Sequence, residues 1–362
     1  RSTRRLTLFP YTTLFRLEYP PGALPVFVLP ALGRPGFDLY DHEFQVLMAL
    51  CGIGALLAMT VALRALHASA ERTAAALAFA ALAPLVLGSV ILYRYDLWPA
   101  ALTVAGLAAV LSGRGRLGFG AFGLGVAAKV FPAVVVPPAL MYVWRTRGRR
   151  EALVCLGVAL AVVAVVVVPF LALAPDGLRD SVVRQTTRPV QIESLASAVL
   201  LAAHQVGGLG ITMETSHGSQ NLVGSLPHAL GSVSSVLLVG ALLAIWVAAA
   251  RGPATGERLV RYSAASLVAF IALSKVLSPQ FLIWLIPLVP LVRGRRGLAA
   301  SALFGLALLL TQLWFPIRYW DLALRFAAFP SWLVVARDLV LLALLAVLLI
   351  PFREREPAPA GS

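Results

Sequence analysis

Cysteines and charged side chains are both scarce in this chain of 362 residues. The two cysteines, Cys51 and Cys155, each lie inside a long apolar run, so the sequence implies neither a disulfide framework nor a metal site. Charged residues make up 13% of the chain, about half of the share in a soluble domain. The sequence also lacks a phosphate-binding P-loop, a Gly-x-Ser-x-Gly elbow and a His-Glu-x-x-His zinc motif.

Long apolar runs fill most of the chain instead. Hydrophobic residues account for 60% of the sequence, and the mean hydropathy is +0.87. Because one membrane crossing needs about 20 apolar residues, this composition predicts an integral membrane protein with many spans. Clear single crossings are expected at 43–63, 74–92, 97–112, 152–171, 227–250, 298–315 and 332–350. The longer runs 117–143 and 262–292 are predicted to be hairpins of two short helices, which gives an all-α fold with about 11 crossings, several of them short or broken.

Arginines gather in the loops at one end of these predicted spans. The net charge is +14, and basic clusters occur at 145–150, 251–261 and 293–296. By the positive-inside rule this end faces the cytoplasm, and clusters of this kind do not form a nucleic-acid-binding face. The opposite, outer side then holds the loop 175–226 and the run 20–32, which is predicted to be a helix on the outer surface. A short span at 20–32 is the alternative.

The two ends of the chain are predicted to lie outside the membrane domain. Residues 1–16 read like translated sequencing-adapter sequence, and we expect them to be non-native; a basic cytoplasmic tail is the alternative. Residues 17–352 are predicted to form a single transmembrane domain, and residues 353–362 a disordered cytoplasmic tail. We therefore expect the native protein to begin further upstream.

Two lysines interrupt the apolar runs at similar places. Lys129 stands in AAKVFP and Lys275 in SKVLSPQ, each followed by a proline. A charge inside a bilayer is costly and usually functional, and a proline frees backbone groups that must then line a cavity or be buried in protein. The pattern predicts a site for a phosphate or pyrophosphate near the outer surface. The alternative is that both lysines reach up to the lipid headgroups from short helices.

Further polar candidates lie on the same predicted side. Arg94 and Asp96 stand in a tight turn, either as a local ion pair or as a carboxylate held at the mouth of a cavity. The motif RPVQIES at 188–194 lies in the outer loop, where functional residues are often found. Within it, Ser194 is also suited to cap a helix that begins at Leu195.

Five short motifs stand in an order that resembles membrane glycosyltransferases of the GT-C type. They are EYPPGAL, RYD, AAKVFP, RPVQIES and KVLSPQ, at 18–24, 94–96, 127–132, 188–194 and 275–280. Within that type the chain is most similar to glycosyltransferase family 87, which contains mannosyltransferases that use polyprenyl-phosphate mannose. The resemblance extends over nearly all of residues 17–352.

The resemblance implies a reaction and a place for it. A hexose, with mannose expected, would pass with inversion from a polyprenyl-phosphate-sugar donor to a glycolipid or glycan acceptor at the outer face of the plasma membrane, without a cofactor. An acidic residue in the first outer loop would act as the general base. In the family that residue precedes the motif at 18–24, so we expect this chain to lack both its first span and its base and to be inactive as a fragment.

The same resemblance assigns the candidate site residues. Glu18 and Asp96 are the remaining candidate catalytic carboxylates, Glu18 only as the nearest substitute for the missing base. The lysines and one arginine would stabilise the leaving phosphate. The substrate-binding candidates are Tyr19, Arg94, Lys129, Arg188, Gln191, Glu193, Lys275 and Gln280, and no metal ligands are expected.

Two other functions fit parts of the pattern. A lipid-phosphate transporter or flippase would also have two broken helices, but transporters place such breaks near the midplane and in repeated halves, whereas here both are predicted near the outer surface and no repeat is evident. A scaffold without chemistry would leave two lysines in apolar runs unexplained. The sequence therefore favours the enzyme.

Overall fold

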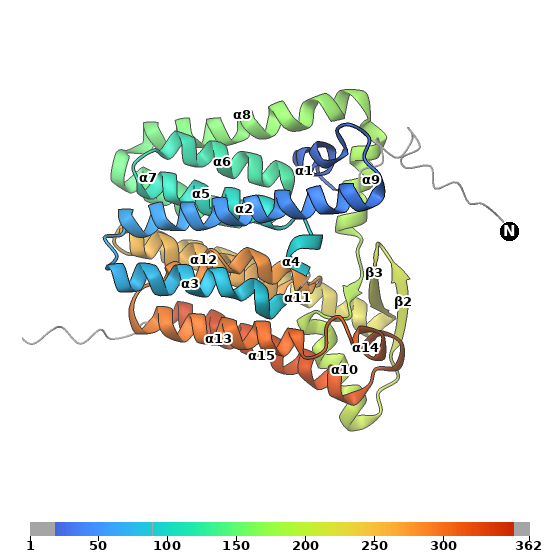
Figure 1. Ribbon diagram of the computed structural model, residues 1–362. Helices are drawn as coiled ribbons and strands as arrows, with labels where there is room; N and C mark the ends of the chain where they lie inside the picture. Colours follow the sequence, from blue (N-terminus) through green and yellow to red (C-terminus); the bar gives the residue numbers. More distant parts are fainter. Residues whose placement is uncertain (1–18, 89, 351–362) are drawn as a thin grey trace, which may run out of the picture.

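The computed structural model describes residues 19–88 and 90–350, most of them in helices that run side by side as one bundle (Figure 1). Glu18, the segment 1–16 and the tail 353–362 lie outside the described residues. Within the described part, regular strands occur only in one small sheet. The prediction of an all-α membrane protein with many spans is confirmed.

Five helices among the described residues are long and apolar enough to cross a membrane. They coincide with the single crossings predicted at 43–63, 74–92, 152–171, 227–250 and 332–350. Two of them expose large apolar side chains along their outer faces, among them Val165 and Val236, as helices in contact with lipid do. These five are α2 (Phe37–Ala65), α3 (Ala70–Leu87), α8 (Arg149–Leu173), α11 (Ser225–Arg251) and α15 (Ala328–Leu349).

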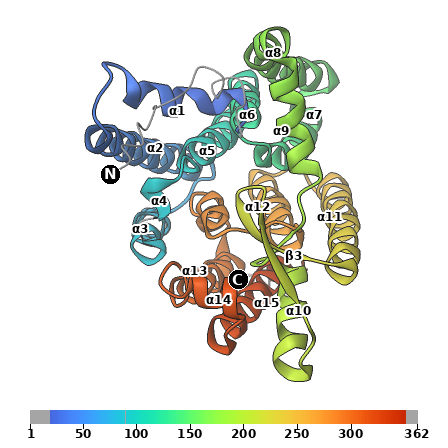
Figure 2. The same cartoon turned by 90° about the vertical axis from the view of Figure 1, so that its right-hand side faces the viewer.

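Shorter helices fill the interior of the bundle. The central one is α12, which is buried along most of its length and lies near the middle of the bundle when seen from the end that carries the sheet (Figure 2). Its neighbours include α7, α11 and α15. The set comprises α5 (Leu97–Leu111), α6 (Gly115–Ala128), α7 (Val136–Arg147), α12 (Gly256–Leu273) and α13 (Gly294–Gln312).

The two predicted hairpins differ in their second halves. In the first, α6 ends before Lys129, a 3-10 turn η3 (Phe131–Val135) follows, and α7 then continues as an α-helix. In the second, the chain after α12 returns through the short 3-10 segments η4 (Pro279–Leu285) and η5 (Val289–Leu291) rather than through an α-helix. Prolines recur at 279, 287 and 290, and each lacks the N–H group that an α-helix needs.

Short elements cover one end of the bundle, on the right in Figure 1. The strands form an antiparallel sheet in the order β1-β3-β2, which the sequence analysis did not anticipate. A second apolar core, which includes Ile192, Leu222 and Trp314, lies beneath it. The elements are η1 (Pro21–Ala23), α1 (Leu24–Val28), η2 (Leu29–Ala31), α4 (Val90–Tyr93), α9 (Pro175–Thr186), β1 (Val190–Gln191), α10 (Leu195–Gly207), β2 (Thr212–Ser216), β3 (Ser219–Val223) and α14 (Tyr319–Arg325).

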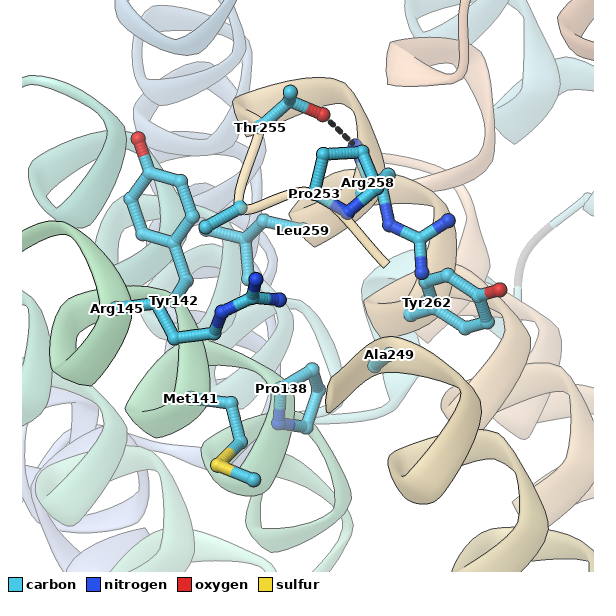
Figure 3. A pocket seen from close by; sticks show the side chains of 11 residues that line it. Pro138, Met141, Tyr142, Arg145, Ala249, Pro253, Thr255, Arg258, Leu259 and Tyr262 are labelled. Carbon is cyan, nitrogen blue, oxygen red and sulfur yellow. Dashed lines mark hydrogen bonds between the residues drawn. The ribbon is translucent and has the colours of Figure 1, made fainter. Parts of the chain in front are cut away.

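The arginine-rich loops lie at the opposite end of the bundle, on the left in Figure 1. One of them encloses a small crevice between α7, α11 and α12, of about 20 Å³ (Figure 3). Arg145 in this crevice donates hydrogen bonds to the carbonyl oxygens of Ala250 and Gly252, and Arg258 donates one to the carbonyl oxygen of Ala248. These bonds satisfy carbonyl groups at the C-terminal end of α11, so the arginines here have a structural role.

Candidate functional site

A cavity of about 1020 Å³ lies where the helical bundle meets the elements at the sheet-bearing end. The predicted substrate-binding residues come from five separate segments of the chain, and the structure brings all of them to its wall: Tyr19, Arg94, Lys129, Arg188, Gln191, Glu193, Lys275 and Gln280. Asp96 lies directly behind the wall. Glu18 lies outside the described residues.

Lys129 is held at the point where α6 ends. Its backbone is extended, and its Nζ donates a hydrogen bond to Oδ1 of Asp96 at 2.6 Å. Trp284 donates its Nε1–H to the same oxygen at 2.5 Å, and Asp96 is fully buried. The ammonium group also lies 4.7 Å from the ring centroid of Tyr95 and 5.2 Å from that of Trp284. Asp96 is therefore the buried counter-ion of Lys129.

This pairing decides between the two interpretations of the turn at Arg94. The ion pairs and hydrogen bonds of the described residues join Asp96 to Lys129 and Trp284, not to Arg94. Arg94 instead lines the cavity. A carboxylate that is buried and accepts two hydrogen bonds is poorly placed to take a proton from a substrate, so the geometry favours a supporting role for Asp96 over a catalytic one.

Lys275 connects two motifs that are far apart in the sequence. Its Nζ donates a hydrogen bond to the carbonyl oxygen of Thr186 at 3.0 Å, and its own carbonyl oxygen accepts one from the N–H of Gln191 at 2.9 Å. The end of α9 and the strand β1 are thereby fixed against the break after α12. The two lysine-proline breaks thus open onto the same cavity.

The wall of the cavity carries several positive charges. Arg94 and Arg188 both lie close enough to Lys129 to interact with its charge, and Lys275 lines the same space. Asp96 balances only one of these charges. Such a concentration of cations around one cavity suits a phosphate group, to which arginine and lysine donate charge-assisted hydrogen bonds.

Glu193 forms a second, different region of the wall. It directly precedes α10, whose first turn is capped by the hydroxyl of Ser194 accepting a hydrogen bond from the N–H of Ser197, as the sequence predicted. The Glu193 side chain is 1% exposed, and within the described part of the chain its Oε2 has no hydrogen-bond partner. The pKa of Glu193 is raised to about 8, chiefly by burial; the positive charges of Arg337 and Arg188 lower it, and the negative charge of Asp338 adds to the rise.

Arg337 and Asp338 were missed by the sequence analysis, which treated 332–350 as a plain span. Both side chains are fully buried on α15, with Nε of Arg337 2.6 Å from Oδ1 of Asp338. Arg337 also donates a hydrogen bond from Nη2 to the backbone carbonyl oxygen of Glu193 at 2.6 Å. The signal that could have revealed them is the pair of charges inside an apolar run, which is expensive and therefore usually functional.

The remaining wall of the cavity is aromatic and aliphatic. Trp284 is stacked between Phe131 and Phe281, with ring centroids 4.1 and 4.2 Å apart. On the far side, Tyr319 donates a hydrogen bond from its hydroxyl to Oε1 of Gln220. Aliphatic side chains of α6 and α8, namely Val126, Val163 and Val167, complete the lining. One cavity therefore presents both a cationic and an apolar surface to its contents.

The described residues contain no group of three or more His, Cys, Asp or Glu side chains placed to hold a metal ion. The cations that line the cavity are amino-acid side chains, and they could themselves neutralise an anionic group.

Residues 17–279, more than half of the chain, match the family described as Glycosyltransferase family 87. No curated protein matches. A solved structure, that of ArnT from Cupriavidus metallidurans bound to undecaprenyl phosphate, is similar with 17% sequence identity and a TM-score of 0.45. The match covers 91% of this chain and 66% of that one.

Proposed function

Because this chain belongs to glycosyltransferase family 87, we propose that it transfers a hexose, mannose in the first place, from a polyprenyl-phosphate-sugar donor to a hydroxyl group of a glycolipid or glycan. The observation that carries this proposal is one cavity of about 1020 Å³ with a cationic region and an aliphatic region side by side. A polyprenyl phosphate has the same two parts, an anionic phosphate and a long apolar chain.

The cationic region would bind the phosphate of the donor. Lys129, Lys275 and Arg188 lie around one space, and Arg94 reaches it from the turn before α5. As the bond between sugar and phosphate breaks, negative charge grows on the phosphate oxygen, and fixed cations stabilise that charge more than they stabilise the intact donor. Attack by the acceptor from the opposite face of the sugar would give inversion.

The apolar region would hold the lipid chain. Val163 and Val167 lie on α8, whose side chains are mostly exposed rather than buried inside the bundle. This helix is also long enough to cross a membrane. A donor could therefore lie with its phosphate among the lysines while its isoprenoid chain follows α8 toward the bilayer. No nucleotide is needed for such a donor.

The arginine-rich loops support an extracytoplasmic site in the plasma membrane. They gather at the end of the bundle opposite to the cavity (Figure 1). If this basic end faces the cytoplasm by the positive-inside rule, the cavity opens at the outer face of the membrane. Acceptors at that face include glycolipids and envelope glycans.

The two lysines allow a direct binding test, because Lys129 and Lys275 are the only lysines in the sequence. Purified protein in detergent is treated with an amine-acylating reagent, with and without undecaprenyl phosphate, and the modified lysines are counted by mass spectrometry. We expect the lipid phosphate to protect Lys275, and undecaprenol, which has the same isoprenoid chain but lacks the phosphate, to leave it reactive. Equal modification with both lipids would contradict phosphate binding at this cavity.

A second candidate function is a lipid-phosphate transporter or flippase, because transporters also have broken helices like those at Lys129 and Lys275. An assay of sugar transfer distinguishes the enzyme from such a transporter. Because we expect this chain to lack its first span and its base, the assay uses the protein extended by its native upstream sequence, and membrane vesicles containing it receive radiolabelled polyprenyl-phosphate mannose. We expect label to leave the donor and to appear in a second glycolipid or glycan. Intact donor that only changes leaflet would identify a transporter.

A further inference from the structure

A tight turn at residues 191–194 presents two polar side chains to the cavity. Gln191 and Glu193 both line its wall, whereas Ile192 between them belongs to the second apolar core. The N–H group of Ser194 donates a hydrogen bond across the turn to the carbonyl oxygen of Gln191 at 2.9 Å. Because the backbone of the turn is fixed in this way, the two polar side chains have defined positions in the wall.

Each of these side chains has an oxygen atom that lacks a hydrogen-bond partner among the described residues. Gln191 is 3% exposed and Glu193 is 1% exposed, and the atoms without partners are Oε1 of Gln191 and Oε2 of Glu193. A buried polar atom without a partner is costly, and native proteins keep such atoms mainly where a ligand or a water molecule supplies the partner. The hydroxyl groups of a sugar are suitable partners for both.

The same part of the wall contains further neutral polar groups. Gln220 on the neighbouring strand β3 and Tyr319 on α14 both line the cavity, and the Tyr319 hydroxyl donates a hydrogen bond to Oε1 of Gln220. Behind the turn, Arg337 donates a hydrogen bond to the backbone carbonyl oxygen of Glu193 at 2.6 Å. This region therefore differs from the cationic region in offering mainly uncharged hydrogen-bonding side chains.

Glu193 is itself uncharged at neutral pH. Its pKa is raised to about 8, chiefly by burial and in spite of the positive charges of Arg337 and Arg188. A protonated carboxyl group has one O–H donor and keeps acceptor capacity, and the amide group of Gln191 likewise offers both donors and an acceptor. Such groups match a hexose, whose hydroxyl groups both donate and accept, and they do not repel the negative charge of the donor phosphate.

The turn also lies beside the cationic region. Arg188 is close enough to both Lys129 and Glu193 to interact with the charge of each. In a polyprenyl-phosphate-sugar donor the hexose is bonded directly to the phosphate. A phosphate held by the cations would therefore place its hexose in the adjoining part of the cavity, where the turn 191–194 forms the wall.

We propose that the turn at 191–194 is the hexose subsite of the donor, in which the side chains of Gln191 and Glu193 bind hydroxyl groups of the sugar; this rests on the proposed function. The phosphate then binds to the cationic region, the lipid chain to the aliphatic region and the hexose to the turn. Such a subsite distinguishes the sugar-bearing lipid from the lipid phosphate that remains after transfer, because only the former makes these hydrogen bonds.

The test measures binding, which requires no catalytic base, so the chain is used as it stands. Acylation of Lys275 is followed at pH 7 with increasing amounts of two lipids of equal charge. One is undecaprenyl-phosphate mannose, and the other is undecaprenyl methyl phosphate, which lacks the sugar. The concentration that halves the acylation is determined for each lipid, and the comparison isolates the contribution of the hexose.

Glu193→Leu removes the hydrogen-bonding groups and keeps a side chain of similar size. We expect the half-protecting concentration of the mannosylated lipid to rise about fivefold or more, as for a lost hydrogen bond, and that of the methyl phosphate to change less than about twofold. Gln191→Leu should give the same pattern and is a second, independent variant. Glu214→Leu, on the exposed strand β2, is the matched control and should change neither value.

Glu193→Gln separates a neutral hydrogen bond from a requirement for charge. The amide keeps both a donor and an acceptor, so we expect each half-protecting concentration to stay within about twofold of the wild-type value. A residue that only fills space would be replaced equally well by leucine. A Glu193→Gln protein that loses as much affinity for the mannosylated lipid as Glu193→Leu would contradict the neutral subsite.

The remaining outcomes are distinct. Unchanged protection by undecaprenyl-phosphate mannose in both leucine variants overturns this inference and leaves phosphate binding standing. Equal weakening with both lipids shows that the turn supports the phosphate region or the fold, and also overturns it. If neither lipid protects Lys275 in the wild-type protein, the proposed function fails together with this inference.

Discussion

At the scale of single residues, the chemistry of the site depends on which partner each buried charge has. Lys129 and Asp96 lie far apart in the sequence, yet each provides the charge that the other needs in an apolar interior. Removing one partner of a buried ion pair leaves the other uncompensated, which typically costs about 3 to 5 kcal/mol. Glu193 has no such direct partner, and its environment favours the protonated form.

Lys129→Ala should therefore destabilise the protein more than Lys129→Ala combined with Asp96→Asn. The single variant leaves the Asp96 carboxylate buried with only Trp284 as a hydrogen-bond donor, at an expected cost of about 3 kcal/mol, reduced because Lys129 is partly exposed. The double variant removes both charges and should recover most of that loss. Thermal unfolding in detergent measures this coupling; strictly additive shifts in Tm would contradict a direct pair.

Glu193 should make stability depend on pH in a defined direction. Its pKa in the folded protein is about 8, against an ordinary value of 4.5, so between these values the folded state binds more protons than the unfolded state. Stability then falls as the pH rises through this window. Glu193→Gln should remove that part of the fall, and the exposed Glu214→Gln should not, as measured by Tm at pH 5 and pH 8 in the same detergent. An identical fall in wild type and Glu193→Gln would contradict the raised pKa.

At the scale of elements, the cavity depends on a close contact between η1 and the end of α6. A Cβ atom on Gly22 would lie 2.5 Å from the backbone carbon of Ala127, closer than real atoms approach. The carbonyl oxygen of Gly22 also accepts a hydrogen bond from Nε1 of Trp98 at 3.2 Å. Tyr19 and Lys129, which lie near this contact in the sequence, both line the cavity.

Gly22→Ala should displace η1 from α6. We expect a lower Tm, because the added Cβ atom overlaps with backbone atoms that cannot move aside. We also expect undecaprenyl phosphate to protect the lysines less well from acylation. Gly36→Ala is the matched control, since a Cβ atom there meets nothing within 4 Å. Equal Tm values for the two variants would show that the packing of η1 on α6 is looser than described.

At the scale of the whole molecule, the bundle has two chemically different ends. The small sheet, the short helices and the large cavity lie at one end, and the arginine-rich loops at the other (Figure 1). Arginines of the basic end satisfy helix carbonyl groups, as Arg145 and Arg258 do around the crevice of Figure 3, and the cations of the other end surround the cavity. The direction of the charge bias gives the orientation proposed here.

That orientation predicts which end an impermeant thiol reagent reaches in intact cells. With Cys51 and Cys155 replaced by alanine, a cysteine at Glu214 on β2 should react from outside, and a cysteine at Arg295, at the start of α13, only after the membrane is permeabilised. Both positions are exposed, so burial does not account for a difference. The reverse pattern would place the cavity on the cytoplasmic side.

The sequence by itself determined the parts of this protein that depend on local physics. Apolar runs of membrane length became helices, Lys129 marked the break after α6, and Ser194 capped α10, because hydrophobic length, proline and capping act within a few residues. The resemblance of five short motifs to glycosyltransferase family 87 agreed with the family match.

Only the tertiary structure decided which of these residues meet. It joined Lys129 to Asp96 and Trp284, placed Glu193 against Arg337, and folded the outer loop into a sheet that no local pattern announced. The partner of a buried charge depends on which distant helices pack against it. In an apolar interior, that partner determines both the energetic cost of the charge and its pKa. For this reason the sequence could identify the charged residues, while only the fold showed which partner each of them has.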